Sequence, residues 1–184
     1  MYHPYYGNYQ MYHYNYHPAY WAYPNQMEQG GRSDYSDDWR NVQKDFGQKP
    51  FVVDIEEASK QNKNYRTALW TGKHLQVTVM SINVGDDIGL EMHPHVDQFI
   101  CIEEGQGIAQ MGPTKDYLNF QRNVSEDSAI MVPAGTWHNV INIGNKPLKL
   151  FTIYAPPNHP FGTVHVTKSD AMGQKKAIDM VDNR

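Results

Sequence analysis

Three histidines and one amide are spaced so that they could meet on one metal ion. His93 and His95 are separated by one residue, Gln98 follows shortly after, and His138 lies much further along the chain. In a β-strand, residues i and i+2 point to the same face, so His93 and His95 are expected to project together. Neutral imidazole is a common metal ligand. The pattern predicts one divalent metal ion held by His93, His95, Gln98 and His138.

Glu91 is expected on the same face as the two close histidines if this strand is regular. It could complete the metal shell as a carboxylate. It could instead act as a general base whose pKa is raised by partial burial, which makes it the candidate catalytic residue. An ordinary strand carboxylate is the third interpretation, and the sequence leaves all three open.

Two sequence motifs frame these residues. The first contains His93-x-His95, Gln98 and Gly105, and the second is Pro133-x-Gly135-x-x-His138-x-x-x-Asn142. Together they resemble the two motifs of the cupin superfamily. The resemblance implies an all-β fold, a single cupin barrel (double-stranded β-helix, or jelly roll), over roughly residues 50–166. Gly85 resembles the glycine that opens the first motif, although its distance to His93 is longer than usual.

Cupins bind one metal through two close histidines, a glutamate and a later histidine. In this resemblance His93 and His95 match the pair, His138 matches the last ligand, and Gln98 stands where the glutamate normally stands. A glutamine offers a neutral oxygen, so such a shell leaves the +2 charge of the ion uncompensated and strengthens it as a Lewis acid. Zn, Ni, Mn and Fe(II) all suit these ligand types.

This chemistry favours isomerase or lyase activity on a small oxygenated or sugar-like molecule. An Fe(II)-dependent dioxygenase is an alternative. A further alternative is a non-catalytic cupin that binds a metal or ligand, because a fold does not determine a function.

The run from Ala155 to His165 resembles the C-terminal signature of small single-domain bacterial cupins, many of them isomerase-like with no assigned substrate. The resemblance also implies a homodimer. His159 and His165, in this run, are expected to be structural.

Short apolar segments separated by turn residues must position these side chains. Gly72-Lys73 predicts a hairpin between two of them, and no alternation of strands and helices typical of a parallel sheet is present. The segments predict strands at 51–55, 65–71, 74–83, 88–95, 98–103, 106–111, 129–132, 138–142 and 148–154. A short helix is compatible with residues 56–64, and an amphipathic C-terminal helix is predicted over 169–181, with Ser169 as its cap.

The N-terminal part has a different composition. Residues 1–27 contain no Asp, Glu, Lys or Arg and are rich in Tyr, with His, Pro, Asn and Gly. Such a segment lacks the aliphatic side chains that offset the entropy of folding, so residues 1–48 are predicted to be a disordered tail and linker, and residues 49–184 the cupin domain. The tail could be a tolerated extension, a metal-binding tract, or a self-assembly element similar to the tails of spore-coat proteins.

Composition excludes other classes. The formal net charge is −4, and no Lys/Arg cluster suggests binding to nucleic acid. Cys101 is the single cysteine of the chain, so no intramolecular disulfide is expected. No apolar run predicts a membrane span or a secretory signal. A cytoplasmic protein with a small-molecule ligand is expected, with the spore coat as the alternative location.

Overall fold

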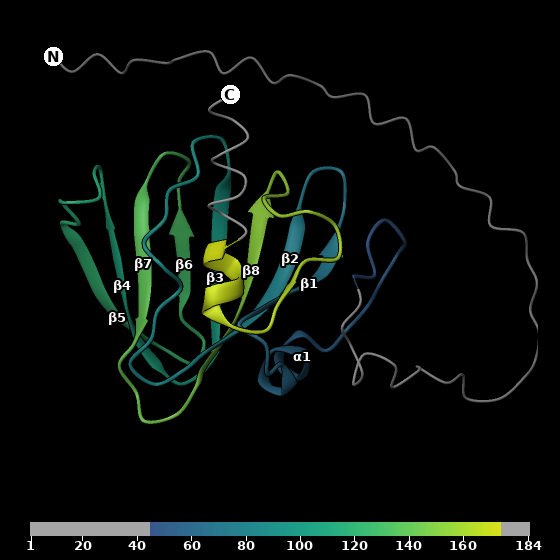
Figure 1. Ribbon diagram of the computed structural model, residues 1–184, viewed down its shortest axis with the longest axis horizontal. Coiled ribbons are helices and arrows are strands. Elements are labelled where there is room, and N and C mark those ends of the chain that lie inside the picture. Colours follow the sequence, from purple (N-terminus) through teal and green to yellow (C-terminus); the bar gives the residue numbers. More distant parts are fainter. Residues whose placement is uncertain (1–44, 174–184) are drawn as a thin grey trace, which may run out of the picture. The chain divides into compact units, whose positions relative to one another are not determined.

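The computed structural model describes residues 45–173 of the chain, and the Tyr-rich segment 1–44 lies outside the described residues. These residues form two antiparallel sheets that build the predicted β-barrel (Figure 1). The larger sheet has the order β6 (Ala129–Val132), β3 (Asp97–Glu104), β8 (Leu148–Ala155), β2 (Gln76–Ile82), β1 (Arg66–Thr71) and β9 (Val164–His165). The smaller sheet has the order β5 (Phe120–Ser125), β4 (Gln106–Gly112) and β7 (Trp137–Asn142).

The inner face of the larger sheet changes from apolar to polar along its strands. Met80, Leu150 and Ile102 lie in register across β2, β8 and β3, and all three are buried in the main core. Nearer the other end, β8 pairs Tyr154 with Gln76 on one side and Gln98 on the other, and all three are buried. The apolar end stabilises the barrel, and the polar end is where an interior site can form.

The outer face of the same sheet is covered by the N-terminal part of the fold. The predicted strand at 51–55 is wrong, because the chain has no regular structure there until helix α1 (Ile55–Gln61) begins. Asp54 caps this helix by accepting a hydrogen bond from the backbone of Glu57 at 3.0 Å. Apolar side chains of the segment, including Phe51, pack instead against Leu69 and Val79. The apolar run at 51–55 therefore reflects packing onto the sheet and not a strand within it.

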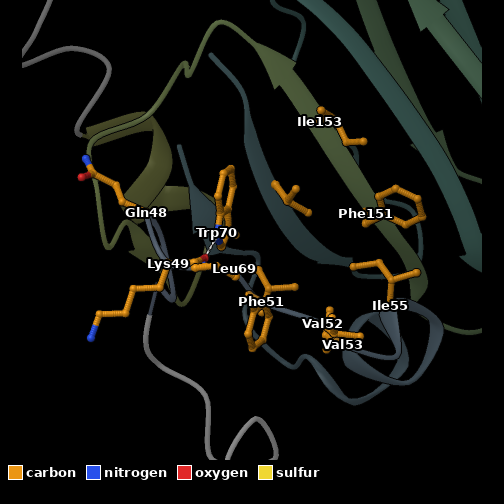
Figure 2. A pocket seen from close by; sticks show the side chains of 12 residues that line it. Gln48, Lys49, Phe51, Val52, Val53, Ile55, Leu69, Trp70, Phe151 and Ile153 are labelled. Carbon is orange, nitrogen blue, oxygen red and sulfur yellow. Dashed lines mark hydrogen bonds between the residues drawn. The ribbon is translucent and has the colours of Figure 1, made fainter. Parts of the chain in front are cut away.

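An apolar groove of about 710 Å³ lies where this segment crosses the sheet (Figure 2). Phe51 and Val53 from the segment, and Phe151 and Ile153 from β8, are among the residues that line it. The Trp70 indole N–H donates to the Lys49 carbonyl at 2.8 Å, and both residues line the groove. Phe151 and Ile153 alternate along β8 with the inward-facing Tyr154, so this groove and the polar interior lie on opposite faces of the sheet.

The chain after β9 returns to the barrel and enters a helix at residue 168, which continues to residue 173. Thr167, rather than the predicted Ser169, caps it: the Asp170 N–H donates to its hydroxyl at 3.3 Å, and its own N–H donates to the Asp170 carboxylate at 2.8 Å. Ala171 joins the core. The predicted remainder of this helix lies outside the described residues. Within residues 45–173, no helix has the length and apolarity needed to cross a membrane.

Asn142 should be a major contributor to stability. Its side chain is buried, donates to the carbonyls of Ile82 and Lys146, each at 2.9 Å, and accepts from the backbone of Gly144 at 2.9 Å. Asn142→Ala would leave buried backbone groups unpaired and should lower the free energy of unfolding by about 2–4 kcal/mol. Urea denaturation measures this loss. The exposed Asn145→Ala, three residues away, should change it by less than about 0.5 kcal/mol; equal losses would contradict the assignment.

Candidate metal centre

Glu91 and His138 are held side by side by their own backbones. They form an isolated antiparallel bridge, in which the Glu91 N–H donates to the His138 carbonyl at 3.1 Å and the His138 N–H donates to the Glu91 carbonyl at 2.9 Å. The backbone of Gly135 donates to the carbonyl of His93 at 2.8 Å. The segment around Glu91 is thus fixed along the start of β7, which brings two distant parts of the sequence into one site.

The side chains of Glu91, His93 and His138 converge, and one ligand atom of each lies within 4.8 Å of the others. The Glu91 Oε1 atom is 3.4 Å from His93 Nε2 and 3.6 Å from His138 Nε2. All three groups are largely withdrawn from solvent, with His138 only 1% exposed. None of these three atoms has a hydrogen-bond partner among the described residues. This cluster is able to hold a metal ion.

The orientation of His138 is set by a second contact. Its Nδ1 lies 2.9 Å from the carbonyl oxygen of Thr136, which can only accept a hydrogen bond. We infer that a neutral His138 carries its proton on Nδ1, which leaves the lone pair of Nε2 directed at the cluster. Metal-binding histidines are commonly oriented by such a carbonyl. The Nε2 of neutral His138 then faces Glu91 Oε1 at 3.6 Å without a proton between them. This repulsion is relieved either by a second proton on the ring, which lowers the pKa of Glu91, or by a metal cation.

Glu91 is ionised under ordinary conditions. Burial by itself raises the pKa of this carboxyl, but the contacts with His138 and His93 and the positive charge of Arg66 outweigh burial and hold the pKa well below its usual range. The centre therefore contains a negative charge, and an anionic oxygen is a good ligand for a divalent ion.

Gln98 also presents an unused oxygen. Its side-chain nitrogen donates to the Thr152 hydroxyl at 3.0 Å, while its Oε1 is buried and has no hydrogen-bond partner in the described part of the chain. Gln98 lies in register with Tyr154, whose ring makes an edge contact with the ring of His93 at 5.7 Å between centroids. Gln98 thus has a buried, unpaired oxygen in the polar interior, and Thr152 fixes its amide group.

The structure does not bring His95 to this cluster. The predicted strand at 88–95 is absent: residues 88–93 contain one isolated bridge, at Glu91, and Pro94 and His95 form a turn with the His95 side chain exposed. Without a regular strand, the two-residue alternation cannot extend from His93 to His95. The inward pair is instead Glu91 and His93. The long spacing from Gly85 to His93 is the sequence signal that favours Glu91 as the first ligand of the motif.

A second group of polar residues adjoins the centre and is largely missed by the sequence analysis. Arg66 is buried in β1, Tyr154 is fully buried in β8, and the ring of His159 contacts that of Tyr154 at 5.0 Å. One sequence feature points to Arg66: it is a charged residue two positions before the buried Ala68, so both side chains lie on the same face of β1. His159 was expected to be structural, and Gln76 indeed holds its backbone through hydrogen bonds of 2.9 and 3.0 Å.

Comparison with known proteins identifies the family of the chain. A family model described as the cupin domain matches residues 78–154, the span that contains Glu91, His93, Gln98 and His138. The crystal structure of BH2720 from Bacillus halodurans is 63% identical in sequence, with a TM-score of 0.70 over 71% of this chain and 98% of BH2720. The chain belongs to the cupin superfamily. The resemblance inferred from the two motifs is thereby confirmed.

This cupin has relatives in distant organisms. The uncharacterised protein YrkC of Bacillus subtilis is 66% identical over 160 residues, which cover 84% of this cupin and 85% of YrkC. The uncharacterised protein L612 of Acanthamoeba polyphaga mimivirus is 40% identical over 124 residues, which cover 67% of this cupin and 76% of L612. These relatives support the family and the fold, and the function of this cupin must be argued from its own site.

Proposed function

We propose that this cupin binds one divalent metal ion through Glu91, His93, Gln98 and His138 and acts on a small oxygenated or sugar-like molecule. The single observation that supports this most strongly is the convergence of buried acceptor atoms on one point, with Glu91 Oε1 within 3.6 Å of both imidazole Nε2 atoms. Buried polar atoms are normally paired, so several unpaired nitrogen and oxygen atoms in one place favour binding of a cation there. His95 has no role in this proposal.

The donor set suits a catalytic ion. Two imidazoles, one carboxylate and one amide oxygen are ligands that Zn, Mn, Ni and Fe(II) accept. Compared with the neutral shell predicted from the sequence, Glu91 adds one negative charge and compensates part of the +2 charge. When bound, the ion would supply Lewis-acid polarisation of a carbonyl or hydroxyl oxygen, as in isomerase or lyase reactions.

The protein's own groups define what surrounds a substrate there. Burial raises the pKa of Tyr154 to about 12, so its hydroxyl keeps its proton and can donate a hydrogen bond. Thr152 fixes the amide of Gln98, and Thr136 fixes the ring of His138. The ligands are therefore preorganised by neighbouring groups, a property that catalytic metal sites share.

An Fe(II)-dependent oxygenase is the second candidate, and the presence of Glu91 is the observation that favours it. Two histidines and one carboxylate with open positions are the ligand set typical of non-haem Fe(II) oxygenases. The neutral shell of His93, His95, Gln98 and His138 disfavours this reaction, and a carboxylate from Glu91, one of the three interpretations left open by the sequence, would favour it.

Metal-dependent proton exchange tests the first candidate. Metal-stripped protein reconstituted with Zn²⁺ or Mn²⁺ would be incubated in D₂O with glyceraldehyde, dihydroxyacetone and short aldoses, and NMR would follow deuterium at the carbon beside the carbonyl. We expect exchange at least about tenfold above that of stripped protein and of Glu91→Ala protein treated with the same metal, because the variant should not retain the ion that polarises the carbonyl. Equal rates in all samples, with oxygen uptake by the Fe(II) protein, would replace the first candidate by the second.

A further inference from the structure

Arg66 is a buried cation with an incomplete set of partners. Its side chain is only 4% exposed, and its Nε has no hydrogen-bond partner among residues 45–173. Arg66 lies in register with Met80, which faces the core, so its side chain enters the barrel interior. Taking an ion out of water costs several kcal/mol unless an opposite charge and hydrogen bonds compensate it. The position of Arg66 therefore requires an anion nearby.

The negative charge of Glu91 stabilises the charged guanidinium of Arg66. Once Glu91 is a metal ligand, its single negative charge faces both a divalent ion and the guanidinium of Arg66. The centre and Arg66 together then carry an excess of positive charge in a buried region. A ligand that brings a negative charge would relieve this excess, whereas a neutral sugar would not.

Two further groups face the same interior region and also lack partners. The hydroxyl of Tyr154 lies near Arg66 and Thr152 but makes no hydrogen bond of ordinary geometry in the described part of the chain, and the buried Nε2 of His159 makes none either. The two rings meet edge to face at 5.0 Å, and Tyr154 in turn contacts His93 at 5.7 Å. Gln76 fixes the backbone of His159, so the loop that carries it is rigidly placed. These contacts connect the group directly to a metal ligand.

We propose that Arg66, Tyr154 and His159 form a carboxylate-binding subsite beside the metal centre, so that the substrate is a short hydroxy or keto carboxylic acid. The planar guanidinium of Arg66 matches a carboxylate with two parallel hydrogen bonds. Tyr154 would donate a third hydrogen bond, and the hydroxyl or keto oxygen of the acid would point toward the ion held by Glu91 and His93. This inference rests on the metal centre proposed above and specifies the substrate class for it.

Glycolate and its neutral isostere glycolamide distinguish a charged subsite from a merely oxygen-binding one. Each would be titrated calorimetrically into Zn²⁺-loaded full-length protein at low salt, after Zn²⁺ binding itself has been titrated. We expect wild-type protein to bind glycolate at least about tenfold more tightly than glycolamide, since a charge-assisted bidentate pair is strong. Arg66→Met should reduce glycolate affinity at least about tenfold, to the level of glycolamide, with Zn²⁺ stoichiometry unchanged.

Two conservative variants keep the test valid if Arg66→Met does not fold. Arg66→Lys retains the charge without the planar fork and should lose part of the preference for glycolate. Tyr154→Phe should weaken glycolate by about threefold to tenfold, as loss of one hydrogen bond does. Equal affinity for glycolate and glycolamide in wild-type protein, or a preference that persists in both Arg66→Lys and Tyr154→Phe, would overturn the subsite. The separate Zn²⁺ titration tests the metal centre itself. Absence of Zn²⁺ binding to wild-type protein would refute that centre and not the subsite.

Discussion

Replacing Glu91 with alanine should weaken metal binding by at least about 100-fold, whereas replacing His95 should leave it unchanged. Changes to groups that only orient metal ligands already cost about 10–100-fold in affinity, so loss of a direct ligand should cost at least as much. Glu91 lies 3.4 Å from His93 Nε2 and 3.6 Å from His138 Nε2, while His95 is exposed in a turn. Competition of Zn²⁺ against a chromophoric chelator measures both affinities.

His95→Ala is the matched control for this experiment, because it removes an imidazole from the same segment without touching the cluster. His93→Ala, two residues earlier, should behave like Glu91→Ala. Circular dichroism and thermal unfolding of each variant establish that the barrel is intact. If His95→Ala lost metal as severely as Glu91→Ala, the pair His93 and His95 predicted from the motif would be the correct one.

Replacing His159 with asparagine should remove about 2 kcal/mol of acid destabilisation between pH 7.5 and pH 5. Burial, and then the positive charge of Arg66, lower the pKa of His159 from 6.5 to about 3. Between these two values the unfolded chain binds a proton that the folded protein does not. The free energy of unfolding therefore declines as the pH falls from 6.5 towards 3, and is fully retained above 6.5.

Urea denaturation of metal-stripped protein at pH 7.5 and pH 5.0 measures this effect. The range stays above the ordinary pKa of carboxyl groups, so the depressed pKa of Glu91 contributes little to it. His159→Asn retains the backbone hydrogen bonds to Gln76, which do not involve the imidazole. The exposed His74→Asn serves as control and should keep the wild-type dependence. An identical pH dependence in wild-type and His159→Asn protein would show that His159 is not held neutral by its surroundings.

The fold could be predicted from the sequence because local signals and the two motifs agree. The hairpin at Gly72 and Lys73 joins β1 to β2, and the short helix after Asp54 is present as α1. The segment at 51–55 was predicted as a strand because it is a short apolar run, but its apolar side chains pack onto a sheet without joining it. A short apolar run does not by itself distinguish a strand from a packed segment without regular structure.

The candidate site was predicted in position more accurately than in composition. His93 and His138 meet, and Gln98 pairs with Tyr154, whose ring contacts His93. Glu91 lies in the cluster, a position compatible with the metal-shell role that was one of its three interpretations. His95 was misplaced because the alternation rule assumes a strand, and Pro94 lies in a turn at that point. Arg66 lies in a strand separated from the motifs in sequence, so only the register with β2 and β9 places it near the centre.

The most direct test of the proposed centre is anomalous diffraction from crystals of the full-length protein, purified without an affinity tag or added metal. Elemental analysis first identifies the metal, and diffraction data are then collected on both sides of its absorption edge. The proposed centre predicts one anomalous peak per chain, bonded to His93 Nε2, His138 Nε2, Glu91 Oε1 and Gln98 Oε1 at the usual distances of about 2.0–2.2 Å for nitrogen and oxygen ligands. A peak bonded to His95, or a metal-free protein that gains no peak after soaking in Zn²⁺, Mn²⁺ or Fe²⁺, would contradict it.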